Sequence, residues 1–379
     1  MQSLRSDALE PDTHHLTEKG WSRIFKIGLH YLPVYGLVIL TGILISVFSV
    51  LLPGTFCTWT NARLIMSNQS VTAVLALAAM VPMVAGKIDL SLGYGVVLSE
   101  VLAISFQTAY HLPWPLVLVL LLLVGAAIGL ANALLVELAQ IDSFIATLGT
   151  GTVIYAIALW YTNGEQVIGT VAPGFLQVAD ASLFGIPLPA IYVVILAVAL
   201  WAILDYLPIG RCLYAVGANP QAAKLNGIPT RKYIVWAFIA SGSLTAFAGF
   251  VLASRLRIGQ IGVGLDYLLP ALVAAFLGST TIKPGRVNVW GTMVAVVILA
   301  TGISGLQQMG GAFYVDPLFN GLTLLFAIGL AGLTGRRRLA RRRRESYLVR
   351  TSEKSTAQKS DSTPALPPSS PSPRHPTTP

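Results

Sequence analysis

The sequence predicts an all-α polytopic membrane protein with about ten transmembrane helices. Hydrophobic residues make up 54% of its 379 residues, and charged residues make up only 11%. Uncharged apolar runs of roughly 20 residues, the length of a helix that crosses a bilayer, recur between residues 31 and 335. These runs leave no room for a large soluble domain, so we expect one transmembrane domain over 31–335.

Each apolar run is assigned one span, and Pro, Gly and charged residues mark the turns between them. The expected spans are 32–52, 71–85, 91–110, 116–138, 144–162, 188–206, 233–253, 267–278, 289–306 and 318–333. We expect Arg63 to lie between the first two spans, and 163–187 to be a loop with a partly apolar surface. Roughly eight or eleven spans are the alternatives to ten.

The basic residues predict the orientation in the membrane. With the N-terminus inside and about ten spans, only Arg63, Arg255 and Arg257 of the 25 lysines and arginines lie outside. Because short loops rich in Lys and Arg stay in the cytoplasm, both termini are expected inside. The polar segment 1–30 and the loop 207–232 are then cytoplasmic.

Residues 336–379 form a tail. A basic run, GRRRLARRRR, occupies 335–344, and the remainder is rich in Ser, Thr and Pro. Such a run directly after a span anchors the topology and contacts anionic lipid, so the net charge of +9 indicates a membrane rather than a nucleic acid as partner. The Pro- and Ser-rich part cannot bury a core and is expected to be disordered.

The loop 207–232 contains a short helix whose two ends are both marked in the sequence. Asn219 can cap the first free N–H groups, Pro220 suits the first helical position, and Gly227 suits a left-handed residue after the last turn. The predicted helix, 220–226, is marginal by itself, because isolated helices in water need roughly 12–15 residues.

A partner surface is therefore expected on this helix. Ala222 and Ala223 are small enough to let a partner approach closely, and Lys224 can place its charge at the rim of the contact. The alternative is a capped helix in an ordinary surface loop.

The motifs of an enzyme are absent from the sequence. It contains no Gly-x-x-x-x-Gly-Lys-Ser/Thr loop, nucleophile elbow, paired catalytic carboxylates or His-rich metal spacing. Its cysteines, Cys57 and Cys212, are expected on opposite sides of the membrane and lack the neighbours of a metal site. The sequence thus predicts a protein that is not an enzyme and holds no cofactor or metal.

Polar residues within the apolar runs are candidates for a substrate pathway, because a charge in the bilayer is costly and tends to face a cavity or a partner. The candidates are Asp89, Ser91, Glu100, Asn132 and Thr147. Asp89 precedes a helix, where its carboxylate can accept from exposed N–H groups, so a structural role competes with substrate contact. Glu100 without a partner would cost roughly 2–3 kcal/mol at the bilayer centre, and its simpler reading is a buried interhelical hydrogen bond.

Four stretches carry a resemblance to a known family. They are GKIDLSLG at 86–93, NALLVELAQIDSFIATLGT at 132–150, GRCLYAVGANPQAAKLNGIP at 210–229 and the glycine-rich 271–291. In this order and spacing they closely resemble the membrane permease of bacterial ribose-type ABC sugar importers, over about 61–333. Two departures are Lys87, where the family usually has glycine, and Asp142-Ser143, where many members have prolines.

The resemblance implies a type II-like permease subunit of the bacterial inner membrane, without an ATPase site of its own. Two permeases, identical or paralogous, would form the pathway, with a separate ATPase beneath and a periplasmic or surface-tethered sugar-binding protein above. The resemblance also implies that 217–227 contains the coupling helix that docks on the ATPase. The expected coupling residues are Gly217, Asn219, Pro220, Ala222, Ala223, Lys224 and Gly227.

Two alternatives to this function are open. A secondary transporter driven by protons or sodium would use Glu100 as its titrating group, although ion coupling usually requires more intramembrane carboxylates than this sequence has. An ABC permease for a polyol, a furanose signal or a branched-chain amino acid would keep the same architecture, because specificity in this class would lie largely in the binding protein.

Overall fold

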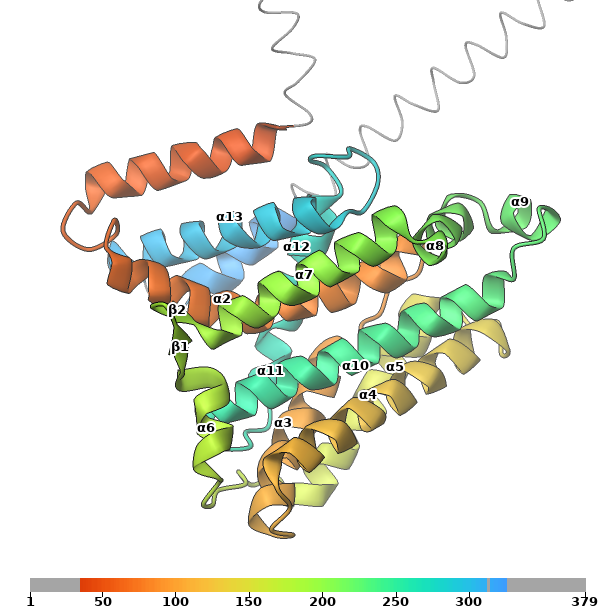
Figure 1. The fold of residues 1–379 in the computed structure, drawn as a ribbon, viewed down its shortest axis with the longest axis horizontal. Coiled ribbons are helices and arrows are strands. Elements are labelled where there is room, and N and C mark those ends of the chain that lie inside the picture. The colour runs from red at the N-terminus through yellow and green to blue at the C-terminus, as the bar shows by residue number, and fades with distance from the viewer. Residues whose placement is uncertain (1–34, 312–313, 326–379) are drawn as a thin grey trace, which may run out of the picture. The chain divides into compact units, whose positions relative to one another are not determined.

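The computed structural model describes residues 35–311 and 314–325, and all of them belong to one compact unit. The described residues form a bundle of helices with one small two-stranded sheet among them (Figure 1). The predictions for segment 1–30, for the tail 336–379 and for the second half of the tenth span lie outside the described residues.

Most helices begin and end where Pro, Gly or charged residues interrupt the apolar runs. In chain order, the elements are an apolar helix Tyr35–Leu51, α2 (Trp59–Val84), α3 (Leu92–Thr108), α4 (Trp114–Glu137), α5 (Ser143–Thr162), α6 (Pro173–Asp180), β1 (Ser182–Leu183), β2 (Ile186–Pro187), α7 (Leu188–Tyr206), α8 (Pro208–Ala218), α9 (Pro220–Leu225), α10 (Thr230–Leu256), α11 (Val263–Asp266), α12 (Leu268–Gly278) and α13 (Val289–Gln308). Residues 315–325 are also helical.

The described part of the chain has the helices of a polytopic membrane protein. Six of them are long and apolar enough to cross a membrane by length and composition, namely α2, α4, α5, α7, α10 and α13. Shorter apolar helices are Tyr35–Leu51, α3 and Val263–Gly278. The spans predicted at the third to ninth positions, from 91–110 to 289–306, each coincide with a helix.

Helix α10 lies within the bundle in contact with α4, α3 and α2 (Figure 1). Its contact with α4 brings backbone against backbone at glycine. A Cβ at Gly125 would lie 2.2 Å from the carbonyl oxygen of Gly242, and a Cβ at Gly129 would lie 2.1 Å from that of Phe238. Small residues allow membrane helices to approach in this way, and the close packing then holds them together. Helix α10 thereby fixes α4, and with it the candidate site.

The second predicted span, 71–85, is wrong at its start. Helix α2 already begins at Trp59, so Arg63 lies within a helix and not in a loop. The Thr58 hydroxyl accepts from the Asn61 N–H at 3.2 Å and caps the helix, while Arg63 is exposed. The polar run Ser67-Asn68-Gln69-Ser70 and the exposed Arg63 lower the hydropathy of this stretch without interrupting the helix.

Two segments expected to be simpler contain further elements. The predicted loop 163–187 holds α6 and the β1–β2 hairpin, and the ring of Phe175 on α6 is fully buried against Phe250 of α10, with 5.1 Å between ring centroids. The loop 207–232 holds α8 in addition to α9, because Pro208 occupies the first turn and Leu213 and Val216 supply a buried face. Both extra helices are short and amphipathic, so neither contains the long apolar run by which the spans are located in the sequence.

Candidate functional site

Helices α2 and α3 are joined by a non-helical segment, 86–91, that passes between other helices. Its backbone cannot make helical hydrogen bonds, so other groups must satisfy it where water is scarce. Side chains in the first turns of α5 do so. The Ile88 N–H donates to the Ser143 hydroxyl at 3.2 Å, and the Leu90 N–H donates to the Thr147 hydroxyl at 2.9 Å. The break between α2 and α3 is therefore held in place by α5.

Asp89 is the centre of a buried polar cluster at this break. Its Oδ1 accepts from the Ser91 N–H at 3.0 Å and from the Ser91 hydroxyl at 2.6 Å, and its Oδ2 accepts from the Ser241 hydroxyl of α10 at 3.0 Å. Asn132 of α4 donates to the Ser91 hydroxyl oxygen at 2.8 Å. The predicted hydrogen bond between Asp89 and an N–H at a helix start is confirmed. This Asp89 cluster, made of Asp89, Ser91, Asn132 and Ser241, ties the start of α3 to α4 and α10.

Glu100 lies fully buried on α3 and contacts irregular backbone. Its Oε1 accepts from the Gln260 N–H at 3.1 Å, in the turn between α10 and α11, while its Oε2 has no hydrogen-bond partner among the described residues. The same turn exchanges two backbone hydrogen bonds, each of 2.9 Å, between Val167 and Gly259. The hydrogen bond expected for Glu100 is present, but its donor is in a turn and not in another helix. It satisfies a backbone N–H group that lipid could not satisfy.

The predicted pathway residues enclose little space in this conformation. Asp89, Ser91, Glu100, Asn132 and Thr147 are each no more than 3% exposed. The void beside Ser91, between α3, α4 and α10, has a volume of about 10 Å³. Because small-molecule sites have volumes of roughly 300–1,000 Å³, a substrate could reach these residues only if the three helices separated. Their place in a substrate pathway stays a prediction.

The two departures from the resembled family have structural partners at this break. Lys87 Nζ lies 3.6 Å from Glu137 Oε1, at the end of α4. Asp142 caps α5, because its Oδ1 accepts from the Phe144 N–H at 3.0 Å, and Ser143 supplies the hydroxyl that holds the broken segment. Both departures therefore strengthen the contact of 86–91 with α4 and α5.

Helix α8 ends directly on the break. A Cβ at Gly217 would lie 2.0 Å from the carbonyl oxygen of Val84, so no side chain fits between α8 and the end of α2. On the other side of the contact, Gly86 has a φ of +76°, a conformation that favours glycine, and its Cβ would lie 3.4 Å from the Gly217 carbonyl oxygen. The last turn of α8 and the break thus touch through their backbones.

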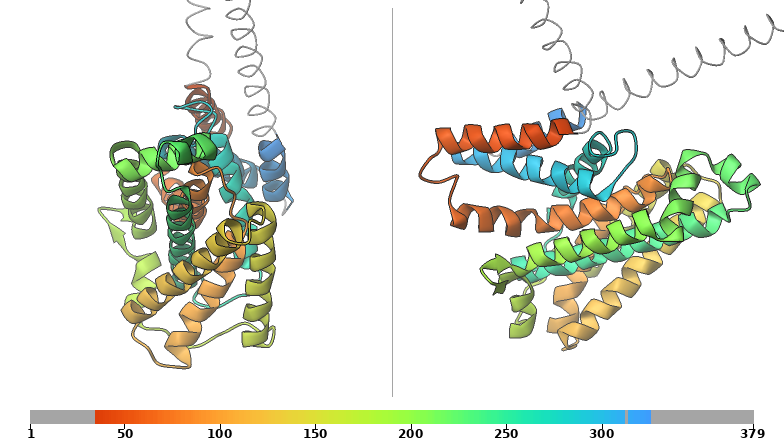
Figure 2. Two further views of the ribbon diagram at one scale, coloured as in Figure 1. Left: turned by 90° about the vertical axis from the view of Figure 1, so that its right-hand side faces the viewer. Right: turned by 45° about the horizontal axis from the view of Figure 1, so that its top comes forward.

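Helix α9 has the two ends that the sequence predicts. Asn219 Oδ1 accepts from the Ala222 N–H at 3.0 Å, and Gly227 has a left-handed φ of +78°. The helix lies at one end of the bundle, next to α8 and the start of α10 (Figures 1 and 2). At its own end, the apolar side chain of Leu225 is 89% exposed.

The surface that α9 offers to a partner differs from the expected one. Ala223 is only 4% exposed and belongs to the hydrophobic core of the chain itself. Ala222, Lys224 and Leu225 are exposed. The expectation that a partner approaches Ala223 is therefore wrong, because this alanine anchors α9 to the bundle.

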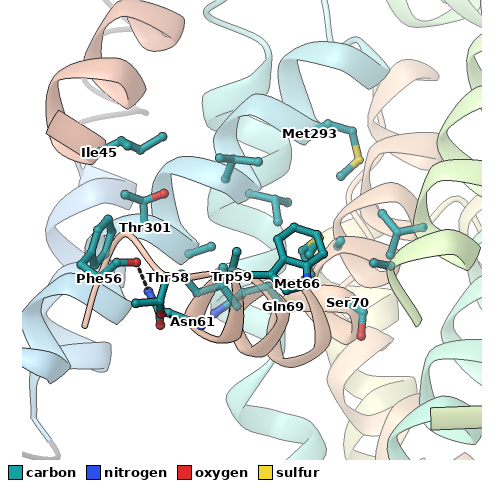
Figure 3. A pocket seen from close by; sticks show the side chains of 18 of the residues that line it. Ile45, Phe56, Thr58, Trp59, Asn61, Met66, Gln69, Ser70, Met293 and Thr301 are labelled. Carbon is teal, nitrogen blue, oxygen red and sulfur yellow. Dashed lines mark hydrogen bonds between the residues drawn. The ribbon is translucent and has the colours of Figure 1, made fainter. Parts of the chain in front are cut away.

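A larger space lies between Tyr35–Leu51, α2, α7 and α13 (Figure 3). Its volume is about 630 Å³, and its wall is mostly apolar, with Asn61, Gln69 and Ser70 on α2 among the polar exceptions. A second cavity, of about 290 Å³, adjoins it between α2 and α13. The sequence does not indicate either cavity, because the expected span starts at residue 71 and so leaves the lining residues Trp59, Asn61 and Gln69 outside the helix.

Ser241 was missed by sequence analysis, and Ser143 was noted only as a departure from the resembled family, although both complete the site. Serine is tolerated in many membrane helices, so a single hydroxyl gives little signal. The run Ser241-Gly242-Ser243 within a predicted span could have indicated Ser241, since small residues collect where membrane helices meet.

Comparison with known proteins relates most of the chain to transport permeases. Residues 61–330 match the family described as branched-chain amino acid transport system / permease component. The chain is 31% identical over 300 residues to the ribose import permease protein of Haemophilus influenzae, which covers 78% of this chain and 92% of that protein. It is 33% identical over 287 residues to the ribose import permease protein of Bacillus subtilis, covering 76% and 88%. It is 29% identical over 296 residues to the D-allose transport system permease protein of Escherichia coli, covering 78% and 90%.

No solved structure matches the chain significantly. The apolar helices and the similarity to permeases together define a multi-pass membrane protein of the transport-permease class. Within that class, the chain belongs to the family of branched-chain amino acid transport system permease components.

Proposed function

We propose that this chain is the membrane permease subunit of an ATP-binding cassette importer that translocates a monosaccharide. The observation that carries this proposal is the similarity to permeases for ribose, D-allose and galactose, each over more than three quarters of the chain. These relatives cover both pentose and hexose cargo. The family description names branched-chain amino acids, which makes an amino acid the cargo that a test must separate from sugars.

The proposed topology has ten spans with both termini in the cytoplasm of a bacterial cell, and the protein in its inner membrane. The distribution of basic residues over the two ends of the bundle supports it. The end that carries α9 also has Lys87, Arg211, Lys224, Arg231, Lys232, Lys283 and Arg286, whereas the opposite end has Arg63, Arg255 and Arg257. In this proposal, 1–30 and 336–379 are cytoplasmic, and the basic start of the tail contacts anionic lipid.

The proposed coupling element is α9, which would dock on a separate ATPase. A short helix whose buried side is Ala223 and whose exposed side shows Leu225 suits a contact with a partner, because an exposed leucine gains stability when a partner covers it. We assign the docking surface to Ala222, Lys224 and Leu225. Asn219, Pro220 and Gly227 would fix its geometry.

Movement of α9 would reach the transmembrane helices through α8. Gly217 touches the end of α2 without an intervening side chain, so displacement of α8 pushes directly on the break at 86–91. Asp89 lies in that segment and is hydrogen-bonded to Ser91 and Ser241. The Asp89 cluster would therefore pass the displacement to α3, α4 and α10.

The complete importer would contain partners that bind ATP and capture the sugar. We propose one ATPase on the α9 side, a second copy of this chain or a paralogue to complete the pathway, and a periplasmic or surface-tethered sugar-binding protein. Nucleic acid has no part in this function.

The cargo can be tested with the chain co-expressed with its ATPase and binding protein and reconstituted in proteoliposomes. ATP-dependent uptake of D-ribose, D-allose, D-galactose and L-leucine would be compared. We expect uptake of at least one sugar and none of leucine. Uptake of leucine without any sugar would replace the proposed cargo by an amino acid and leave the coupling mechanism intact.

A second candidate function is ion-coupled transport, which one observation favours. The Oε2 atom of Glu100 is buried without a hydrogen-bond partner among the described residues, as a carboxylate that takes up a proton could be. The same side chain already accepts from Gln260, however, and so has a structural role that needs no ion coupling.

A further inference from the structure

The two adjoining cavities between α2 and α13 share Asn61, Ile65, Gln69 and Ala300 in their walls. The smaller one has polar side chains along much of its lining, all of them uncharged. They are Asn61, Asn68, Gln69, Ser304, Gln307 and Gln308, and we call this cavity the carboxamide cleft. Such a concentration of amides stands out in a chain whose membrane helices are otherwise apolar.

The amides of the carboxamide cleft are only partly satisfied by the protein. Gln308 Nε2 donates to Asn61 Oδ1 at 2.9 Å and to the Ser304 hydroxyl oxygen at 3.1 Å. Gln308 Oε1 is buried and has no partner among the described residues, and Gln69 makes no side-chain hydrogen bond to them. A buried amide oxygen without a partner is costly, so Gln308 Oε1, together with the half-buried Gln69 in the same lining, indicates water or a ligand in the cleft.

The carboxamide cleft lies at the end of the bundle opposite α9. Helix α2 starts there and α13 ends there, at Gln308. Arg255 at the end of α10 braces this end, because it donates to the Ser67 and Asn68 carbonyl oxygens at 3.4 and 3.2 Å and also to the side-chain oxygen of Asn68. In the proposed topology this is the outer side, where a binding protein delivers its sugar.

The larger cavity continues from the carboxamide cleft toward the α9 side. On α13 its lining runs from Thr301 back to Met293, near the start of that helix (Figure 3). Gln308, at the end of α13, lines the carboxamide cleft. The residues of α13 that line the two cavities therefore extend from Met293 to Gln308, over most of the helix. The ring of Trp59, which is 57% exposed, lies on the α2 wall close to Asn61 and Gln69 (Figure 3).

We propose that the carboxamide cleft is the site at which this permease receives a monosaccharide on the outer side of the membrane. Carboxamides donate and accept hydrogen bonds, as sugar hydroxyl groups do, and Trp59, which lines the adjoining larger cavity, offers an apolar face to the C–H side of a sugar ring. No charged side chain is in the lining, and the charges behind it are already engaged, because Arg255 donates to Asn68 and Gln307 donates to Asp316. An amino acid is therefore disfavoured, since its carboxylate and ammonium groups would have no free charge to pair with. A volume of about 290 Å³ suits one sugar ring, at the low end of the roughly 300–1,000 Å³ of small-molecule sites.

This inference rests on the proposed function and assigns residues to it. The apolar wall of the larger cavity would also suit a lipid chain, but a lipid chain would leave the amides of Gln69 and Gln308 unsatisfied. A sugar satisfies them.

The decisive variants are Gln69→Leu, which removes the free amide, and Gln69→Asn, which retains it on a shorter stem. Gln177→Leu is the matched control, because Gln177 is an exposed glutamine of α6 on the same side and lines neither cavity. Each variant would be reconstituted with its ATPase and binding protein. The maximal rate of uptake of the sugar that the unmodified complex carries and the ATP hydrolysis stimulated by loaded binding protein would both be measured.

We expect Gln69→Leu to lower maximal uptake roughly threefold to tenfold, as for the loss of one or two hydrogen bonds. The KM for sugar and the stimulated ATP hydrolysis should remain normal, so less sugar moves per ATP. The uptake per ATP of Gln69→Asn should lie between that of Gln69→Leu and that of the unmodified complex, and the uptake of Gln177→Leu should equal that of the unmodified complex.

Equal uptake per ATP in Gln69→Leu and Gln177→Leu overturns the inference while the proposed function stands. Loss of assembly or stimulated hydrolysis in both Gln69 variants makes Gln69 a structural residue and also overturns it. If the unmodified complex takes up no sugar with ATP, the proposed function fails first. Should Gln69→Leu not assemble, a Leu64→Cys variant decides the matter in a background that carries Cys57→Ser and Cys212→Ser, because Leu64 lines the carboxamide cleft. The transported sugar should slow maleimide labelling at position 64, and an unchanged rate contradicts the site.

Discussion

Gly217 lies so close to Val84 that a Cβ at position 217 would be 2.0 Å from the Val84 carbonyl oxygen. This contact joins the last turn of α8 to the end of α2, and α9 follows only two residues later in the chain. Closely packed backbones move together, because any gap between them forfeits their contact energy. The Gly217–Val84 contact is therefore a direct route from α8 into the membrane helices, in addition to the contact of α9 with the start of α10.

Replacing Gly217 with alanine should uncouple ATP hydrolysis from transport. The added methyl group forces α8 away from α2, and overpacking of this kind costs roughly 1–3 kcal/mol. Since 1.4 kcal/mol is a factor of ten in an equilibrium constant, sugar uptake per ATP should fall about tenfold. Gly149→Ala is the control, because a Cβ at Gly149 has no heavy atom within 4 Å. If both variants transport normally at normal expression, the contact does not transmit the movement.

Leu225→Asp should weaken the association with the ATPase. The substitution removes an exposed apolar side chain from the proposed docking surface and puts a charge in its place, and losing about 1.4 kcal/mol of contact energy lowers binding tenfold. Co-purification of the ATPase in detergent measures this. Phe184→Asp provides the comparison, because Phe184 is 94% exposed at the hairpin on the opposite side. Equal recovery of the ATPase with both variants would show that the docking surface lies elsewhere.

Asp89→Ala should destabilise the folded protein more than Asp142→Ala. The first leaves the Ser91 and Ser241 groups without their buried acceptor, at about 1–3 kcal/mol for each unsatisfied group. The second removes an exposed helix cap worth about 0.5–2 kcal/mol. Thermal unfolding of the two variants in the same detergent compares them. If both substitutions lower the midpoint temperature of unfolding equally, the Asp89 cluster does not stabilise the fold more than an exposed helix cap does.

Impermeant maleimide should distinguish the two cysteines. Cys57 is exposed near the start of α2, and Cys212 lies on α8 beside the proposed ATPase side. With the proposed orientation, intact spheroplasts should show labelling of a Cys212→Ser variant and none of a Cys57→Ser variant. The total labelling of each variant is measured in permeabilised cells. Labelling of Cys212 in intact spheroplasts would reverse the orientation.

Long apolar runs and capping residues could be located from the sequence, whereas contacts between distant segments could not. The span 188–206 coincides with α7, and the caps at Asn219 and Gly227 are as expected, because these features depend on neighbouring residues. The buried position of Ala223 depends on which side of α9 meets the core, and six residues are too few to show that periodicity.

The candidate site shows the same division between local and distant effects. Asp89 could be singled out as a polar residue in an apolar run. The hydrogen bond that Asp89 accepts from the Ser241 hydroxyl joins residues 152 positions apart in the chain, so it depends on the packing of α10. The polar run 67–70 and Arg63 lower the hydropathy at the start of α2, so the sequence places the start of the span at 71 and leaves Gln69 and the carboxamide cleft outside it.

The energy source for uptake distinguishes ATP-driven import from ion-coupled transport most directly. Proteoliposomes that contain the chain and its ATPase, with ATP enclosed and loaded binding protein outside, should import sugar after a protonophore and a sodium ionophore have collapsed both gradients. A non-hydrolysable ATP analogue should stop import, and Glu100→Gln should reduce it only modestly, because the glutamine oxygen can still accept from the Gln260 N–H. Loss of uptake on adding the protonophore at constant ATP would contradict ATP-driven import and would make Glu100 the proton-binding group of a secondary transporter.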